Sequence, residues 1–164
     1  MHFFDDDFGD PLYRPAVGMM ILNAENKIFV GQRLDSKEPA WQMPQGGIGP
    51  HEDTDQAMLR ELEEEIGTRN VEIIVKSKNW YKYDLPAEIA GRLWNGKFKG
   101  QKQIWYVLRF RGQDKDININ TYRPEFRSWK WVEKTELLEL IVPFKHELYA
   151  RILEELWGYV PKNE

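Results

Sequence analysis

The sequence predicts an α/β protein in which helices pack on both faces of a mixed sheet, an α/β/α sandwich. Short apolar and β-branched runs, which are typical of strands, recur along the chain up to residue 132. One amphipathic segment with helix start and stop signals lies among them, and two further helical segments follow. There is no internal repeat, linker or low-complexity stretch, so we expect one domain at residues 13–160 after a flexible tail at residues 1–12.

The expected strands are short, and the first two flank a turn at residues 23–27. Strands are expected at Val17–Leu22, Ile28–Val30, Val71–Val75, Ile104–Phe110 and Trp129–Val132. The segments Leu137–Ile141 and Phe144–Trp157 are expected to be helices. Pro143 must separate them, because proline lacks the N–H group that a helix interior requires.

The central helix is expected at residues 54–66. Thr54 and Asp55 favour a first turn, and Gly67 stands where a helix commonly ends in glycine. One side carries a core-facing apolar stripe formed by Met58, Leu59, Leu62 and Ile66. A neighbouring face carries three glutamates at spacings i, i+3 and i+4, namely Glu61, Glu64 and Glu65.

These glutamates belong to a longer pattern that runs from Gly46 to Gly67. It consists of glycine, five residues, glutamate, seven residues, Arg-Glu-Leu, one residue, Glu-Glu, one residue and glycine. At average residue frequencies it would occur by chance about once in 10⁹ starting positions. The three clustered carboxylates repel one another, and a cation between them would remove that repulsion. For the glutamates alone, the alternative interpretation is an acidic face exposed to solvent.

The loop before the helix favours the metal interpretation. The run Pro44–Pro50 contains three glycines, which allow the backbone to pass close to a ligand and expose carbonyl oxygens. Mg²⁺ takes oxygen ligands and fills its remaining positions with water and substrate phosphates. A loop carbonyl beside helix carboxylates therefore predicts a site for a divalent metal and a polyphosphate.

The pattern resembles the Nudix box, the signature of metal-dependent hydrolases of nucleoside diphosphates linked to another group. The resemblance covers residues 13–157 and points to a bacterial branch that acts on RNA 5′ ends or dinucleoside polyphosphates. It is carried by Tyr13–Pro15, Trp41–Gly47, Gly100–Gln103 with Trp105, Pro124–Phe126 and Trp129–Trp131. One departure is Thr68, which stands at a usually aliphatic position and bears on local packing rather than on chemistry.

The resemblance implies the Nudix fold and a metal site. Two or three Mg²⁺, with Mn²⁺ as a substitute, would be held by the carbonyl of Gly46 and by Glu61, Glu64, Glu65 and Glu125. Catalytic roles are expected for Glu61, Glu65 and Arg60. Glu61 is expected to be the base, with Glu125 as the alternative, while Arg60 orients a glutamate and Glu52 holds the loop against the helix.

The resemblance also implies substrate contacts, from Arg14, Arg33, Tyr83, Lys102 and Phe144. The arginines would clamp phosphates and the aromatic rings would contact a base. Lysines alternate with aromatic residues at positions 76–102, a composition suited to single-stranded RNA. The same aromatics can also be core residues, and we expect this for Trp80 and Trp105.

Composition excludes several classes of protein. The formal net charge is −4, which excludes a generally basic surface and leaves a local patch and bound metal to hold an anionic substrate. No DNA partner and no membrane partner are expected. Without cysteine there is no disulfide framework and no thiol chemistry. No apolar run approaches the roughly 20 residues of a membrane span, and the acidic N-terminus lacks signal-peptide features. We expect a cytoplasmic monomer and leave an activating protein partner open.

Two substrates share the predicted chemistry of phosphoanhydride hydrolysis. One is 5′-triphosphate or diphosphate RNA, shortened to a 5′-monophosphate end that promotes mRNA decay. The other is a dinucleoside polyphosphate such as diadenosine tetraphosphate, split asymmetrically to ATP and AMP. A non-catalytic module and an RNA-binding adaptor are the alternatives from other classes, and the complete set of box carboxylates argues against the first.

Overall fold

The computed structural model of the protein describes residues 12–36 and 39–162. The tail expected at residues 1–12 lies outside this range except for Leu12. The strands are β1 (Tyr13–Leu22), β2 (Ile28–Arg33), β3 (Trp41–Gln42), β4 (Gln45–Gly47), β5 (Val71–Lys76), β6 (Tyr81–Asp84), β7 (Gly100–Phe110) and β8 (Phe126–Val132). The α-helices are α2 (Thr54–Ile66), α3 (Ala87–Ala90), α4 (Lys134–Leu140) and α5 (His146–Leu156). Short 3-10 helices are η1 (Leu93–Gly96), η2 (Asp114–Asp116), η3 (Pro143–Lys145) and η4 (Trp157–Tyr159).

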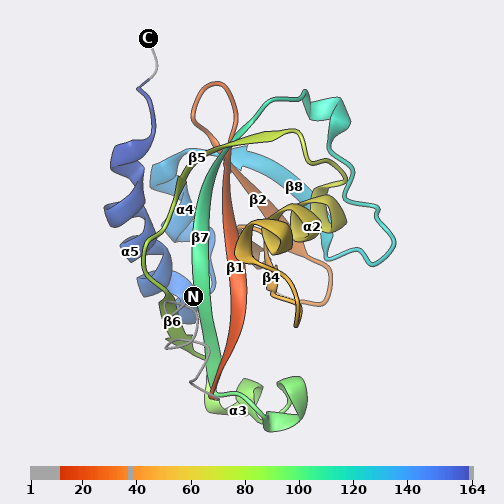
Figure 1. Cartoon of the computed structure of the whole chain (residues 1–164), viewed down its shortest axis with the longest axis vertical. Helices are drawn as coiled ribbons and strands as arrows, with labels where there is room; N and C mark the ends of the chain where they lie inside the picture. Colours follow the sequence, from red (N-terminus) through yellow and green to blue (C-terminus); the bar gives the residue numbers. More distant parts are fainter. Residues whose placement is uncertain (1–11, 37–38, 163–164) are drawn as a thin grey trace.

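The strands of the described chain form one mixed sheet around the parallel pair β1 and β7 (Figure 1). Their register runs from Tyr13 opposite Gly100 to Leu22 opposite Arg109. The other pairings are antiparallel, with β2, β3 and β8 on one side of this pair and β5 and β6 on the other. The short β4 pairs with β1 and leads the chain toward α2.

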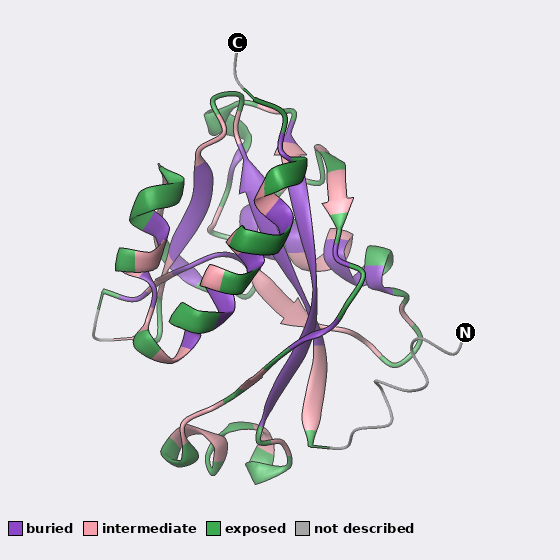
Figure 2. Ribbon diagram, turned by 90° about the vertical axis from the view of Figure 1, so that its left-hand side faces the viewer, coloured by how far each residue is buried: buried purple, intermediate pink, exposed green. Residues whose placement is uncertain are grey.

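Helices cover both faces of the sheet and enclose two apolar cores (Figure 2). On one face Met58, Leu62 and Ile66 of α2 pack on β1 and β7. On the other face α4 and α5 pack through Leu137, Leu148, Tyr149, Ile152 and Leu156. The predicted α/β/α sandwich is therefore confirmed. No helix in the described part of the chain is both long enough and apolar enough to cross a membrane.

Helix α2 has the bounds that its sequence predicts. Asp53 is the N-cap: its side chain accepts a hydrogen bond from Gln56 N at 2.8 Å, while the Gln56 side chain accepts one from Asp53 N at 3.0 Å. This reciprocal capping box satisfies two N–H groups that the first turn cannot pair. At the other end Gly67 has φ 78°, and its N–H donates to Glu63 O. The left-handed conformation there favours glycine.

Several elements begin earlier than the apolar pattern predicts. β1 begins at Tyr13, β7 at Gly100 and β8 at Phe126, each three or four residues upstream of the expected start. The early residues of β7 are polar, yet Gln101 and Gln103 are buried because their amides bond to each other and to the Trp105 indole. Pairing with β1, from Tyr13 opposite Gly100 onward, extends the strand where hydrophobic alternation does not.

Some short elements and two helix starts differ from those expected from the sequence. The strands β3, β4 and β6 were not expected, and β4 lies within the predicted glycine loop. Helix α4 begins at Lys134, three residues before the expected start. Pro143 separates the last two helices as expected, but residues 143–145 form a 3-10 turn before α5 begins at His146.

Candidate active site

Two segments far apart in the sequence bring glutamates to one cleft. Helix α2 supplies Glu61, Glu64 and Glu65, and the loop before β8 supplies Glu125. The cleft has a volume of about 700 Å³, within the usual range for ligand sites. Its remaining lining is Arg60, Glu63, Thr121, Tyr122 and Arg123. We call this the carboxylate cleft; it contains every glutamate that the sequence analysis assigned to metal binding.

Gly46 brings the backbone of β4 against Glu61. It pairs with Val17 of β1, so β4 is an additional strand beside the central pair. A Cβ atom on Gly46 would overlap the carboxyl group of Glu61. Only glycine therefore allows the loop backbone and the helix carboxylate to approach this closely, which is the arrangement that a joint carbonyl and carboxylate site requires.

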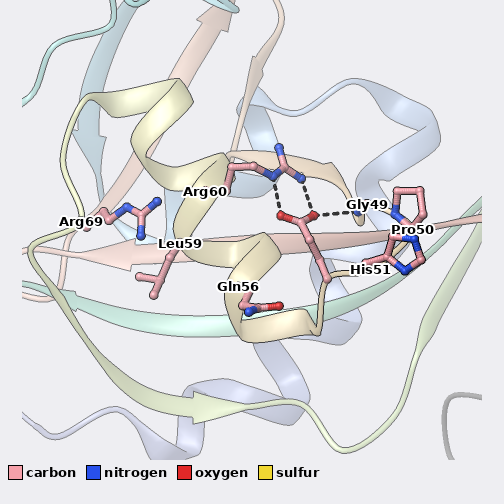
Figure 3. Close-up of a pocket in the computed structure, with 8 residues that line it drawn as sticks. Gly49, Pro50, His51, Gln56, Leu59, Arg60 and Arg69 are labelled. Carbon is pink, nitrogen blue, oxygen red and sulfur yellow. Dashed lines mark hydrogen bonds and ion pairs between the residues drawn. The ribbon is translucent and has the colours of Figure 1, made fainter.

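Arg60 links the loop to the helix (Figure 3). Its Nε and Nη2 donate to the two carboxylate oxygens of Glu52 at 2.6 and 2.8 Å, and Nη2 also donates to Gly47 O at 2.9 Å. Glu52 in turn accepts a hydrogen bond from Gly49 N at 2.7 Å. Two parallel hydrogen bonds of this kind are typical of a guanidinium and a carboxylate, and they hold the loop at a fixed position relative to α2.

The same guanidinium also reaches two predicted metal ligands. Its Nη1 donates to Glu61 Oε1 at 2.8 Å and to Glu64 Oε2 at 2.9 Å. Within the described residues no three His, Asp or Glu side chains converge closely enough to hold one ion between them. In the described structure Arg60 therefore supplies the positive charge beside Glu61 and Glu64.

Glu65 is the glutamate of the cleft that most needs a compensating positive charge. Its side chain is only 3% exposed, and Oε2 has no hydrogen-bond partner among the described residues. Burial raises the pKa of Glu65 well above its usual value, and the charges of Glu61 and Glu125 raise it further. Burial also raises the pKa of Glu61, although Arg60 opposes this. A buried carboxylate without a partner is costly, so these residues fit a divalent metal that would supply the positive charge.

The predicted aromatic contacts lie together on the α5 face of the sheet. The rings of Tyr83 and Phe144 are 6.3 Å apart, and Tyr83 OH donates to Gln101 Oε1 at 3.0 Å. Arg33 is held by Asp35 through two hydrogen bonds of 2.8 and 2.5 Å, which raise the pKa of Arg33. Figure 1 shows β6 and α5 on one side of β1 and β7, with α2 on the other.

Arg14 and Lys102 are placed differently from each other. The Arg14 guanidinium lies against Gly47 of β4, so close that a Cβ atom on Gly47 would collide with it. The guanidinium also lies over the Trp94 ring, 5.1 Å from the ring centroid. Lys102 is fully buried, with its ammonium 5.5 Å from the ring centroid of the buried Trp80. The Lys102 side chain therefore has no exposed surface that a substrate could contact. Trp80 and Trp105 are core residues, as expected.

Sequence reasoning missed a buried polar cluster around Lys145. Its Nζ lies 3.2 Å from Gln45 Oε1 and 3.5 Å from Gln42 Oε1, and Gln103 Nε2 donates to Gln45 Oε1 at 3.1 Å. Burial, aided by the charge of Arg33, lowers the pKa of Lys145 to about 7. Two features of the sequence could have indicated this cluster: Lys145 follows Phe144 directly, and Gln45 lies within the glycine loop.

The described geometry agrees with comparison to known proteins. The model of the NUDIX domain matches residues 12–152. The chain belongs to the Nudix family. An RNA pyrophosphohydrolase of Rickettsia canadensis is 57% identical over 143 residues, which are 87% of this chain and 89% of the relative. A protein of the same name from Rickettsia prowazekii is 55% identical over equal shares.

Solved Nudix structures share the fold at low sequence identity. The E. coli dihydroneopterin triphosphate pyrophosphohydrolase aligns with a TM-score of 0.66 and 16% identity, over 90% of this chain and 99% of that one. An Ap4A hydrolase from C. elegans aligns with a TM-score of 0.64 and 20% identity, over 88% and 98%. Nudix hydrolases generally use divalent metal ions, in keeping with the carboxylate cleft.

Proposed function

We propose that this Nudix enzyme removes pyrophosphate or phosphate from the 5′ end of triphosphorylated or diphosphorylated RNA. The product is a 5′-monophosphate end, which promotes decay of the message. The observation that carries the proposal is the complete carboxylate cleft in a chain 57% identical to a protein named RNA pyrophosphohydrolase. A non-catalytic relative would have lost some of these carboxylates, and all of them are present.

In this proposal the carbonyl of Gly46 and the carboxylates of Glu61, Glu64, Glu65 and Glu125 would hold Mg²⁺, or Mn²⁺ in its place. When bound, the metal would neutralise phosphate oxygens and lower the pKa of the attacking water. Glu61 accepts the proton of that water, with Glu125 as the alternative base. Glu65 supplies buried negative charge, while Arg60 and Glu52 keep the loop and the helix in register.

Substrate binding is assigned to residues outside the box. Arg14 and Arg33 bind phosphate oxygens, since each carries a permanently charged, planar group with several donors. Tyr83 and Phe144 contact the first base through rings that already lie 6.3 Å apart. The full burial of Lys102 leaves it outside this proposed set.

Hydrolysis of a dinucleoside polyphosphate is the second candidate function. The chemistry at the phosphates is the same, so the carboxylates do not distinguish the two substrates. What favours it is an exposed aromatic side chain, Tyr122, in the wall of the carboxylate cleft.

We propose that the enzyme acts in the cytoplasm as a monomer, with an activating protein partner left open.

A competition assay separates the two substrates. Equal concentrations of 5′-triphosphorylated RNA and diadenosine tetraphosphate are mixed with enzyme and Mg²⁺, and kcat/KM is measured for each. Higher kcat/KM for the RNA supports 5′-end processing, whereas higher kcat/KM for the dinucleotide supports the second candidate. Absence of turnover of both, with Mg²⁺ and with Mn²⁺, would contradict both.

The site itself is tested with Glu61→Gln. We expect this variant to fold, as judged by circular dichroism, and to lose turnover of either substrate. The matched control is Glu63→Gln, which changes an exposed glutamate of the same helix that pairs with Arg69. Undiminished hydrolysis by Glu61→Gln would remove Glu61 from the mechanism.

A further inference from the structure

Tyr122 is an unusually exposed aromatic residue in a functional position. Its side chain is 92% exposed, compared with 57% for the exposed Tyr159 near the C-terminus. It lines the carboxylate cleft together with Glu61, Glu64 and Glu125. An aromatic ring left in water forgoes a burial contribution, and a base that stacked on it would recover part of that contribution.

The loop that carries Tyr122 is anchored on both sides of the ring. Asn118 N donates to Ile66 O at 2.8 Å, and Thr121 Oγ1 donates to Glu64 O at 2.5 Å. After the ring, Glu125 O accepts a hydrogen bond from Leu34 N at 2.9 Å. These contacts tie the loop to α2 and to the end of β2, so the exposed ring stands on a fixed backbone.

Arg123 adds a cation that the cleft does not neutralise. Its guanidinium lies 5.7 Å from the Tyr122 ring centroid. Although five glutamates line the same cleft, Arg123 forms no ion pair with any residue in the described ranges. Arg60, by contrast, pairs with three carboxylates. Arg123 therefore remains available for an anionic group that enters the cleft.

Tyr122 and Tyr83 lie on opposite sides of the sheet. Tyr83 packs on the α5 face of the sheet beside Phe144. Tyr122 follows Thr121, which is bonded to α2 on the opposite face. In Figure 1 the loop between β7 and β8 runs along the side of α2 that faces away from β6 and α5. One ring therefore lies in the wall of the carboxylate cleft, and the other lies on the face of the sheet opposite α2.

We propose that Tyr122 and Arg123 form a subsite for the second nucleoside of a dinucleoside polyphosphate. The Tyr122 ring stacks on the distal base, and the Arg123 guanidinium binds the adjoining phosphate. Only a substrate with a base at both ends of its phosphate chain can use both aromatic positions. The RNA 5′ end carries no base beyond its terminal phosphate, so this subsite contributes to the dinucleotide alone.

This inference rests on the proposed hydrolysis in the carboxylate cleft, and substrate comparison tests it. Tyr122→Ala is assayed with diadenosine tetraphosphate, with 5′-triphosphorylated RNA and with adenosine tetraphosphate, which lacks the second nucleoside. Stacking on one aromatic side chain is worth about a tenfold change in binding or more. We expect kcat/KM to fall about tenfold for the dinucleotide and to stay unchanged for the other two.

Three further variants sharpen the result. Tyr122→Phe retains the ring and should retain wild-type kcat/KM for the dinucleotide, whereas Arg123→Gln should lower it. Tyr159→Ala removes an exposed tyrosine from η4 and should change nothing. Equal losses by Tyr122→Ala on all three substrates would mean a general effect on the cleft and would overturn the subsite.

The failures of the two proposals are distinguishable. If wild-type protein hydrolyses the dinucleotide and Tyr122→Ala does so equally well, the subsite is wrong and the proposed chemistry stands. If wild-type protein hydrolyses none of the three substrates, the proposed function is wrong and the subsite falls with it.

Discussion

Arg60 donates hydrogen bonds to both carboxylate oxygens of Glu52, at 2.6 and 2.8 Å, across the junction between the glycine loop and α2. Neither residue has to bind the substrate to affect the reaction. Their contact sets the position of the loop backbone that carries Gly46. It also gives the Arg60 side chain the orientation from which it reaches Glu61 and Glu64.

Replacing Arg60 by lysine should therefore weaken metal binding. A lysine ammonium cannot donate the two parallel hydrogen bonds that Glu52 accepts, so the loop loses its fixed position. We expect Mg²⁺ to be needed at concentrations about 10 to 100 times higher for half-maximal activity. Titration of activity with Mg²⁺ measures this. Arg69→Lys alters a surface pair with Glu63 and serves as the control, which should keep the wild-type Mg²⁺ requirement.

Gly46→Ala tests the close approach of loop and helix. The added methyl group would overlap the Glu61 carboxyl, so either the loop or the side chain must shift. Misplacement by about 1 Å near a reacting centre can cost about 100-fold in rate, and we expect a loss of this size in kcat. Gly158→Ala is the matched control, because a Cβ atom there meets no atom within 4 Å. Wild-type kcat for Gly46→Ala would show that the contact is not needed.

Glu65→Gln tests whether the buried carboxylate requires a cation. The folded-state pKa of Glu65 is raised, so its contribution to the free energy of unfolding is present at low pH and is lost as pH rises through that pKa. In metal-free protein near pH 7 the variant should therefore unfold at higher urea concentration than wild type. Added Mg²⁺ should stabilise wild-type protein more than the variant. Equal stabilisation of both by Mg²⁺ would argue against Glu65 as a ligand.

Lys145 should give the free energy of unfolding a characteristic dependence on alkaline pH. Its folded-state pKa is lowered from 10.5 to about 7 by burial and by Arg33, with Glu65 opposing. Between these values the unfolded chain binds the proton and the folded protein does not, so stability rises with pH across this window. The slope is at most about 1.4 kcal/mol per pH unit.

Lys145→Met removes that titrating group and should flatten the curve. Urea unfolding of both proteins between about pH 7.5 and 9.5 measures the difference, a range chosen to lie inside the window set by the Lys145 pKa values. Its other neighbours, Gln42, Gln45, Tyr83 and Phe144, carry no charge there. Parallel curves for the two proteins would mean that Lys145 stays protonated in the folded state.

The sequence predicted the parts of the fold that depend on local signals. Helix α2 has its expected bounds because the capping residues and Gly67 act within one or two turns. The starts of β7 and β8 were missed because they depend on partners distant in sequence, such as Gln45 for Gln103 and Arg33 for Phe126. No window of neighbouring residues contains that information.

In the candidate site, too, the residues that follow from local sequence were predicted and those that depend on the folded structure were not. The cluster on α2 follows from helical spacing, and the place of Glu125 beside it came from resemblance. Lys145 and Tyr122 escaped notice because their significance lies in burial and exposure: one is a lysine only 4% exposed, the other a tyrosine 92% exposed. Neither property can be read from a residue type, which would suggest the opposite for each.

The parallel pairing of β1 with β7 has a consequence for how the chain acquires activity during synthesis. Residues that pair across these two strands are 87 positions apart, since Tyr13 lies opposite Gly100. The ribosome makes helix α2 with its carboxylates well before it makes β7. The elements β4 and α2 pack against β1, and β1 has no central strand partner until β7 has been made. Long-range pairing of this kind makes folding slow. A nascent chain that ends before residue 100 would therefore carry every glutamate of the box and still have no assembled cleft.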